Sequence, residues 1–335
     1  MRKEKQTHYF KGVKKMIEVK NLTKVFTKEI KGKGIRGYWS PEKKEFVAVN
    51  NIDLSVKKGE VVAFVGPNGA GKSTTIKILT GIVRPTEGEI TVAGLNPVTD
   101  RKALDYKIGC MFGQKSGLWM HLPAIDTYKL LGAIYDIPDD VLEKRVSELI
   151  KEFEIEEIIN TPVRKLSLGQ RMICEIVAIM LHEPEILFLD EPTIGLDIVM
   201  KEKVRNAILN ANKKHGTTIF LTSHDLGDIE KICDRIVIID KGVIIKDESI
   251  EQLKSEFLTE KLITITYQNN VQDIEFGENV ISHTSNKVLL RVDTKLTDIS
   301  EVLAKYMKYG NIVDLETTSV PLEEVIYDIY TKRGD

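Results

Sequence analysis

Short apolar runs recur along the chain, and longer stretches with a helical pattern separate them. Buried strands of a parallel sheet have this form, because helices cover both of their faces. Alternation of such strands with helices is typical of an α/β core. The sequence therefore predicts a parallel sheet whose strands include Val61–Val65, Ile186–Leu189, Thr218–Leu221 and Ile236–Ile239.

A longer helical stretch interrupts this core at about residues 115–165. Leu142, Val146 and Leu149 recur there at helical spacing and predict an amphipathic helix. We therefore expect a helical subdomain inserted into the core. After the last apolar run, Asp240-Lys241-Gly242 predicts a hairpin, and the core is expected to close near it.

The pattern changes again at about residue 257. Strand-like pieces at Leu262–Tyr267 and Val288–Val292 precede two helices with one apolar face each. Asp298 is expected to cap the first helix, and Pro321 to begin the second. Residues 257–335 therefore predict a small α+β accessory domain, and no catalytic constellation stands out in it.

The chain begins with a basic segment. Residues 1–15 carry six basic side chains against one acidic side chain, and they lack the apolar core of a signal peptide. A strand-like alternation then opens at Met16. We expect a basic N-terminal extension at residues 1–15 and a main domain at residues 16–256.

Composition narrows the functional classes. The 335 residues carry 48 basic and 50 acidic side chains, so the net charge is −2. A dedicated nucleic-acid binder would have a basic excess, and no nucleic-acid partner is expected. Three cysteines without a CxxC pair fit neither a disulfide scaffold nor a zinc ribbon. The longest apolar stretch, Ile176–Leu181, is far shorter than the ~18 residues of a membrane-spanning helix, so we expect no transmembrane segment.

The loop after the first apolar run carries candidate chemistry. It fits the pattern GxxxxGK[ST], and a helical segment follows it, whereas a chance glycine-rich turn would lack these flanks. Backbone amides of such a loop and the helix N-terminus attract a polyphosphate. We expect Lys72 to contact the β and γ phosphates and Ser73 to hold Mg²⁺. The predicted phosphate-binding residues are Gly66, Pro67, Asn68, Gly69, Ala70, Gly71, Lys72, Ser73 and Thr74.

Two carboxylates end the apolar run Ile186–Leu189. In a parallel sheet this strand would deliver Asp190 and Glu191 to the edge where the phosphate loop lies. Asp190 is then expected to reach Mg²⁺, and Glu191 to act as general base toward the attacking water. A solvated strand end is the alternative. Several families share these two motifs, so the remaining motifs must distinguish them.

Motifs of one family follow one another in this chain. Leu166-Ser167-Leu168-Gly169-Gln170 resembles the signature motif, usually LSGGQ, of the ATP-binding subunits of ATP-binding cassette (ABC) transporters. In the order of that family, Gln114 matches its Q-loop, Gly195-Leu196-Asp197 its D-loop and Ser223-His224-Asp225 its H-loop. The resemblance covers about residues 16–250. It implies a P-loop NTPase core that binds ATP and Mg²⁺ and hydrolyses ATP.

The resemblance also implies roles for single residues. In this family the signature motif contacts the γ-phosphate held by an opposite subunit, so two chains form a head-to-tail sandwich around two ATP molecules. The second subunit is either another copy of this chain or a close paralogue. Gln114 is expected to link Mg²⁺ or the attacking water to the helical subdomain, and His224 to contact the γ-phosphate. The residues that the resemblance places at the sandwich are Ser167, Gly169, Gln170 and Asp197.

Two positions raise structural questions within this resemblance. Leu168 stands where the signature most often has glycine, so a backbone with positive φ there would be strained. Family members stack adenine on an aromatic side chain near the start of the domain, and Phe26 fits that place. A basic insert, Thr27–Phe46, also carries Tyr38 and Trp39, and either is an alternative partner for the base.

The resemblance extends to a branch of the family and to a partner. The sequence from Ser167 to Met172, together with the additional C-terminal domain, resembles prokaryotic ATPase subunits of the drug-export type. Such a subunit docks on a separate polytopic permease at the cytoplasmic face of the cell membrane. The resemblance places this contact on the helical subdomain, where the apolar segment Trp119, Met120, His121 and Leu122 follows Gln114.

Other functions stand as alternatives. A soluble ABC ATPase of translation or DNA repair would carry two cassettes or a long coiled coil, whereas this chain has one phosphate loop and no heptad array. A sensor that only binds ATP would not need Asp190, Glu191 and His224 together. A GTPase would carry an NKxD motif, which the sequence lacks.

Overall fold

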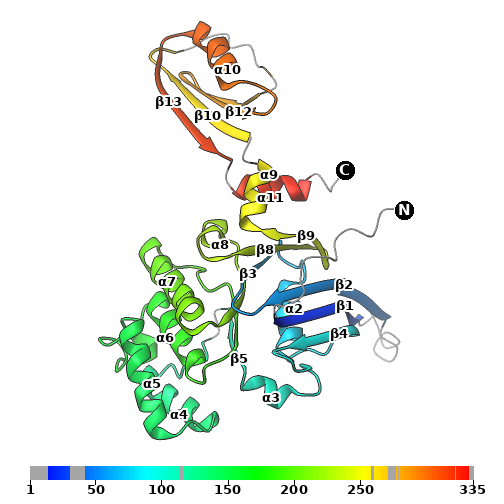
Figure 1. Cartoon of the computed structure of the whole chain (residues 1–335), viewed down its shortest axis with the longest axis vertical. Coiled ribbons are helices and arrows are strands. Elements are labelled where there is room, and N and C mark those ends of the chain that lie inside the picture. Colours follow the sequence, from blue (N-terminus) through cyan, green and yellow to red (C-terminus); the bar gives the residue numbers. More distant parts are fainter. Residues whose placement is uncertain are drawn as a thin grey trace. The chain divides into compact units, whose positions relative to one another are not determined.

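The computed structural model describes residues 14–30, 42–113, 116–257, 260–270, 277, 279–320 and 322–331. Contacts within the chain divide it into two compact units, Met1–Glu248 and Ser249–Asp335. Among the described residues, the first unit contains two sheets and the second unit one, and each unit has its own hydrophobic core (Figure 1). Most of the basic segment 1–15 and also Pro321 lie outside the described residues.

The central sheet of the first unit has the strand order β5-β6-β7-β3-β8-β9. Neighbouring strands from β5 to β8 pair in parallel, which confirms the predicted α/β core. The predicted hairpin joins β8 to β9, and Lys241 and Gly242 both have positive φ, as a type I′ turn requires. The strands are β3 (Val61–Val65), β5 (Ile108–Phe112), β6 (Ile186–Asp190), β7 (Thr218–Thr222), β8 (Arg235–Asp240) and β9 (Val243–Ser249).

Helices α4 to α7 lie on one side of the central sheet in Figure 1, and β1, β2 and β4 lie on the other. Leu142, Val146 and Leu149 are buried along α5, as their helical spacing predicts. A short 3₁₀ helix, η1 (Val163–Lys165), precedes α6. The helices of this unit are α2 (Lys72–Leu79), α3 (Arg101–Asp105), α4 (Ala124–Ile134), α5 (Asp139–Glu152), α6 (Leu168–Met180), α7 (Ile198–His215) and α8 (Leu226–Ile232).

An antiparallel sheet of the first unit has the order β2-β1-β4. Its strands are β1 (Lys15–Ile30), β2 (Glu42–Lys57) and β4 (Glu87–Val92). β1 ends and β2 begins within the insert Thr27–Phe46. The two strands pair so that Phe26 lies directly opposite Phe46. Tyr38 and Trp39 lie outside the described residues, between these two strands.

The second unit contains an antiparallel sheet of order β11-β12-β10-β13. Ile263, Ile265 and Val288 pack with Tyr306 in its core. Asp298 caps α10 by accepting a hydrogen bond from the Ser300 amide at 2.8 Å. The elements are α9 (Ile250–Phe257), β10 (Glu260–Tyr267), β11 (Val280–His283), β12 (Lys287–Asp293), α10 (Ile299–Tyr306), η2 (Met307–Tyr309), β13 (Ile312–Ser319) and α11 (Leu322–Thr331).

Candidate active site

The phosphate loop lies between β3 and α2, and its packing requires glycine at two positions. A Cβ atom at Gly66 would lie 2.2 Å from the carbonyl oxygen of Ile239, and one at Gly71 would lie 2.5 Å from that of Ala48. Gly71 also has a φ of 113°, which residues with a side chain rarely adopt. The loop is therefore pressed against β8 and β2 so closely that a side chain at either position would displace it.

Hydrogen bonds hold the same loop in place. The Gly242 amide donates to the Ala70 carbonyl at 2.9 Å, and the Asn50 amide donates to the Gly242 carbonyl at 2.8 Å. One residue of the β8–β9 turn thus joins the phosphate loop to β2.

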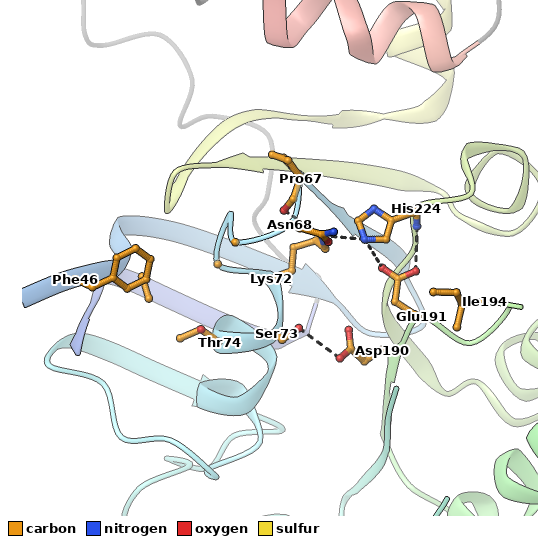
Figure 2. Close-up of a pocket in the computed structure, with 13 residues that line it drawn as sticks. Phe46, Pro67, Asn68, Lys72, Ser73, Thr74, Asp190, Glu191, Ile194 and His224 are labelled. Carbon is orange, nitrogen blue, oxygen red and sulfur yellow. Dashed lines mark hydrogen bonds and ion pairs between the residues drawn. The ribbon is translucent and has the colours of Figure 1, made fainter. Parts of the chain in front are cut away.

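Lys72 lies within the loop and is only 7% exposed. Its Nζ donates to the Gly66 carbonyl at 2.5 Å and lies 3.4 Å from Nε2 of His224 (Figure 2). Burial lowers the pKa of Lys72, while Glu191 and Asp190 act in the opposite direction. An ammonium group and backbone amides that surround one cavity form an arrangement suited to a polyphosphate.

Asp190 ends β6 and faces the start of α2. Its Oδ2 lies 3.4 Å from Oγ of Ser73, and its Oδ1 accepts a hydrogen bond from Oγ1 of Thr222 at 2.6 Å. Asp190 and Thr222 are directly paired in the register of β6 and β7. The sheet thus brings the acidic strand end to the phosphate loop, as the parallel arrangement predicts.

Glu191 and His224 form a second polar pair at this edge of the sheet (Figure 2). Nε2 of His224 lies 3.1 Å from Oε1 of Glu191, and the His224 amide donates to Oε2 at 3.1 Å. Burial raises the pKa of Glu191, and the interactions with His224 and Lys72 oppose this shift. Glu191 also has a φ of 55°, a conformation that side-chain-bearing residues adopt mainly where the surrounding structure enforces it.

These groups surround a cavity of about 430 Å³. The sequence did not single out three of its lining residues, Phe46, Ala48 and Ile194. The predicted Phe26, Gly66 and Ala70 do not line it. Gly66 and Ala70 instead hold the loop in place, since Gly66 packs against Ile239 and the Ala70 carbonyl accepts a hydrogen bond from Gly242. The predicted residues that line it are Pro67, Asn68, Gly69, Gly71, Lys72, Ser73, Thr74, Asp190, Glu191 and His224.

Phe46 is an aromatic residue that lines this cavity (Figure 2). Its side chain is 58% exposed, and Phe26 is its cross-strand neighbour, 40% exposed and stacked under the Lys24 ammonium at 4.8 Å. Phe46 and Ala48 lie two residues apart on β2 and so point to the same face. This alternation of residues along the strand could have predicted Phe46 as a lining residue. The sequence of the insert, however, does not indicate where the strand begins.

The signature motif begins α6. Ser167 and Gln170 form the predicted capping box, with hydrogen bonds of 3.2 and 2.9 Å. Leu168 is the first residue of α6 and therefore has right-handed helical backbone, so the strain of a positive φ does not arise. A Cβ atom at Gly169 would lie 2.6 Å from Cε of Met200, so glycine is needed where α6 meets α7. Ser167, Gly169 and Gln170 do not line the cavity.

Asp197, which belongs to the D-loop match, is the N-cap residue of α7. Its Oδ1 accepts a hydrogen bond from the Met200 amide at 2.9 Å, which satisfies an otherwise unpaired donor of the helix. It does not line the cavity either. Gln114 lies outside the described residues.

Comparisons with known proteins agree with this geometry. A family model described as ABC transporter matches residues 49–194. The ABC transporter ATP-binding protein NatA of Bacillus subtilis is 31% identical over 70% of this chain and 94% of its own length. The chain belongs to the ATP-binding proteins of ABC transporters.

A further relative and a solved structure are also similar to this ABC ATPase. The daunorubicin resistance ATP-binding protein DrrA3 of Streptomyces coeruleorubidus is 34% identical over 62% of this chain and 66% of its own length. A structure of the ATP-binding cassette MJ0796, dimeric and bound to ADP and Pi, matches with a TM-score of 0.59 and 28% identity. The match covers 70% of this chain and 99% of that one.

The family defines what this chain does. It is a nucleotide-binding ATPase subunit with the P-loop NTPase fold, and it binds ATP. Within the described ranges of the chain, every helix is too short or too polar to cross a membrane.

Proposed function

We propose that the chain is the ATPase subunit of an exporter, and that two copies close around two ATP molecules to drive a separate membrane permease. One observation carries this proposal. The phosphate loop, Asp190 and Glu191 line one cavity, whereas the signature residues Ser167 and Gly169 lie outside it. A second copy in head-to-tail orientation would supply its signature helix to that cavity. The dimeric structure of the related MJ0796 supports such a pairing.

Glu191 is the proposed general base. Burial raises the pKa of its carboxyl group, which makes the carboxylate a better acceptor for a proton of the attacking water. His224 holds that carboxylate through Nε2 and its amide and lines the same cavity, where we propose that it contacts the γ-phosphate. Lys72 neutralises charge on the β and γ phosphates.

Ser73 and Asp190 are the proposed ligands of Mg²⁺. Hydroxyl and carboxylate oxygens are the hard donors that this ion prefers, and the two side chains face the same cavity 3.4 Å apart. When bound, Mg²⁺ would neutralise charge on the phosphate oxygens. Gln114 is the proposed third contact, through which we propose that the site is coupled to the helical subdomain.

The adenine site is proposed at the aromatic pair formed by Phe26 and Phe46. Phe46 lines the cavity, and Phe26 extends the same surface from the next strand. The base would stack against an aromatic face, a contact that needs no hydrogen-bond partners from the protein.

The permease is proposed to dock on a groove of about 530 Å³ between the core and the helical subdomain. Its lining combines Tyr106 and Phe112 of the core with Leu118 and Ile134 of the subdomain side. Trp119 follows Leu118 and is 49% exposed. Exposed aromatic and aliphatic side chains beside a concave surface are typical of protein interfaces.

Export is the proposed direction of transport, because the relative DrrA3 is named a daunorubicin resistance ATP-binding protein. We assign ATP hydrolysis to residues 16–256, an accessory role to residues 257–335, and a basic extension to residues 1–15. The division of the chain into two compact units supports a separate C-terminal domain, although the second unit begins at Ser249, before the proposed boundary. The subunit is then a peripheral protein at the cytoplasmic face of the membrane, held by its permease.

Purification of the tagged chain from gently solubilised membranes of its native host tests the transporter assignment. We expect a polytopic permease in stoichiometric amount, identified by mass spectrometry. The matched control replaces Trp119 with Ala, which should weaken recovery of the permease while ATP hydrolysis by the purified subunit persists. Recovery of the chain with ribosomes or DNA-repair proteins and without a permease would instead contradict a role in transport.

A further inference from the structure

Thr222 is the last residue of β7, and it is completely buried at the edge of the active site. Its hydroxyl group lies between the Asp190 carboxylate and the backbone of Glu191. Oγ1 is 2.6 Å from Oδ1 of Asp190 and 3.1 Å from the backbone nitrogen of Glu191. The rest of the strand consists of a buried threonine at its start and three apolar residues.

The chemistry of these two contacts fixes the direction of the hydroxyl proton. A backbone amide can only donate, so Oγ1 of Thr222 accepts from Glu191. The single hydroxyl proton is therefore donated to Oδ1 of Asp190. Asp190 is held by one oxygen, and its other oxygen, Oδ2, is directed to Ser73.

We propose that Thr222 is a positioning residue for ATP hydrolysis, which orients Asp190 toward the metal position and holds the backbone of Glu191. The second effect matters because Glu191 has left-handed backbone, with a φ of 55°. From that conformation its carboxylate reaches both Nε2 and the amide of His224. One hydroxyl group thus couples the two acidic residues to the phosphate loop and to His224.

The fold itself does not depend on this hydroxyl. The Glu191 amide also donates to the carbonyl oxygen of Thr222, at 3.2 Å, and this contact needs no side chain. Valine has nearly the shape of threonine and suits a buried strand. A valine at this position would therefore keep the pairing of β6 with β7 and remove only the hydroxyl link between the Asp190 carboxylate and the backbone nitrogen of Glu191.

Thr218, at the other end of β7, provides a matched control. It is also completely buried, and its Oγ1 accepts a hydrogen bond from the Gly59 amide at 2.9 Å, remote in the strand from Asp190. Thr218→Val therefore removes a buried hydroxyl from the same strand without touching the site.

The inference rests on the proposed role of Asp190 toward Mg²⁺, and the test separates the two. Titration calorimetry would measure the affinity for ATP with and without Mg²⁺, and phosphate release would measure turnover. We expect Thr222→Val to weaken the Mg²⁺-dependent part of the affinity and to lower kcat, each by about tenfold, as for loss of a hydrogen bond to a charged group. Affinity for metal-free ATP should be close to that of the parent, as for Thr218→Val, and the Tm should fall by no more than in Thr218→Val, which also loses a buried hydroxyl group.

Thr222→Ser retains the hydroxyl group and should restore Mg²⁺-dependent affinity and turnover. If Thr222→Val does not fold, Thr222→Ser and Thr222→Ala give the same comparison, since both lack the methyl group. Equal defects in serine and valine variants would overturn the proposal, because shape and not the hydroxyl would then matter. If Asp190→Asn loses the Mg²⁺-dependent affinity and Thr222→Val does not, Thr222 has no positioning role. If neither variant loses it, the metal assignment itself fails.

Discussion

Glu175 on α6 accepts a hydrogen bond from the Gly117 amide, at 2.6 Å. Glu175 is 5% exposed and belongs to the helix that the signature motif begins. Gly117 lies three residues beyond Gln114 and lines the groove proposed for the permease. A buried carboxylate therefore joins the signature helix to the segment that follows the predicted Q-loop residue.

This carboxylate should make stability depend on pH. Burial raises the pKa of Glu175 above its usual value of 4.5, while hydrogen bonds from Gly117 and Ser116 and the charge of Arg171 oppose the shift. The folded protein then holds this proton to a higher pH than the unfolded chain does. The stabilising contribution is complete below the unfolded pKa and is lost as pH rises through the folded pKa. Glutamine keeps the acceptor oxygen and does not ionise.

We therefore expect the Tm of Glu175→Gln to rise relative to that of the parent as pH increases from 4.5 to 8. Thermal unfolding across this range would measure the difference. Glu148→Gln, on the exposed face of α5, controls for the removal of one negative charge. A difference between Glu175→Gln and the parent that stays constant with pH would show that Glu175 does not ionise differently on folding.

The buried ion pair between α7 and α8 predicts a large loss of stability. Arg205 donates through Nε to Oδ1 of Asp228 at 2.7 Å, and the side chains are 9% and 1% exposed. Arg205→Met would leave the Asp228 carboxylate buried without its partner. We expect the free energy of unfolding in urea to fall by about 3–5 kcal/mol.

Lys203→Met on the same helix is the control for that change. Lys203 lies 3.9 Å from Glu154, and both side chains are largely exposed. Its loss should cost less than about 1 kcal/mol. Similar effects of the two substitutions would mean that burial does not determine the contribution of the Arg205 pair.

Glu191→Gln tests the general base. Glutamine preserves the size of the side chain but cannot take a proton from water, so turnover should fall by about a hundredfold or more. ATP affinity should remain near that of the parent, because the phosphate loop is unchanged. Phosphate release and equilibrium binding of ATP would measure the two effects, with Glu157→Gln on the surface as control. Near-normal hydrolysis would require another residue as the base.

The aromatic pair predicts which side chain contacts adenine more strongly. Phe46 lines the cavity and Phe26 does not, so Phe46→Ala should weaken ATP affinity by about tenfold, the scale of one base–aromatic stack, and Phe26→Ala by less. Affinity for inorganic triphosphate should not change in either variant, since it has no base. A greater loss in Phe26→Ala would place the adenine on β1 instead.

The sequence predicts those parts of the fold that short-range pattern determines. The runs in β3, β6, β7 and β8 are apolar because both faces are buried, and the phosphate loop needs glycine for local reasons. The sequence does not predict strand β13, because most of this strand is exposed at the edge of its sheet and carries polar residues in place of an apolar run.

Other features depend on contacts that no local pattern reveals. Thr222 meets Asp190 only through the register of β6 and β7, 32 positions apart in the chain. Gly169 is needed because Met200, on another helix, occupies the space where its side chain would be. The sequence alone does not identify residues of this kind, because the residues that they contact are distant in the chain and are brought close only by folding.

The contacts of Gly242 determine how ATP binding can change the molecule. Because this turn residue ties Ala70 to β2, and Gly66 abuts the Ile239 carbonyl, the phosphate-binding loop is preorganised. A preorganised loop loses little conformational entropy when a ligand binds to it. We therefore expect the backbone of this loop to change little when a nucleotide binds.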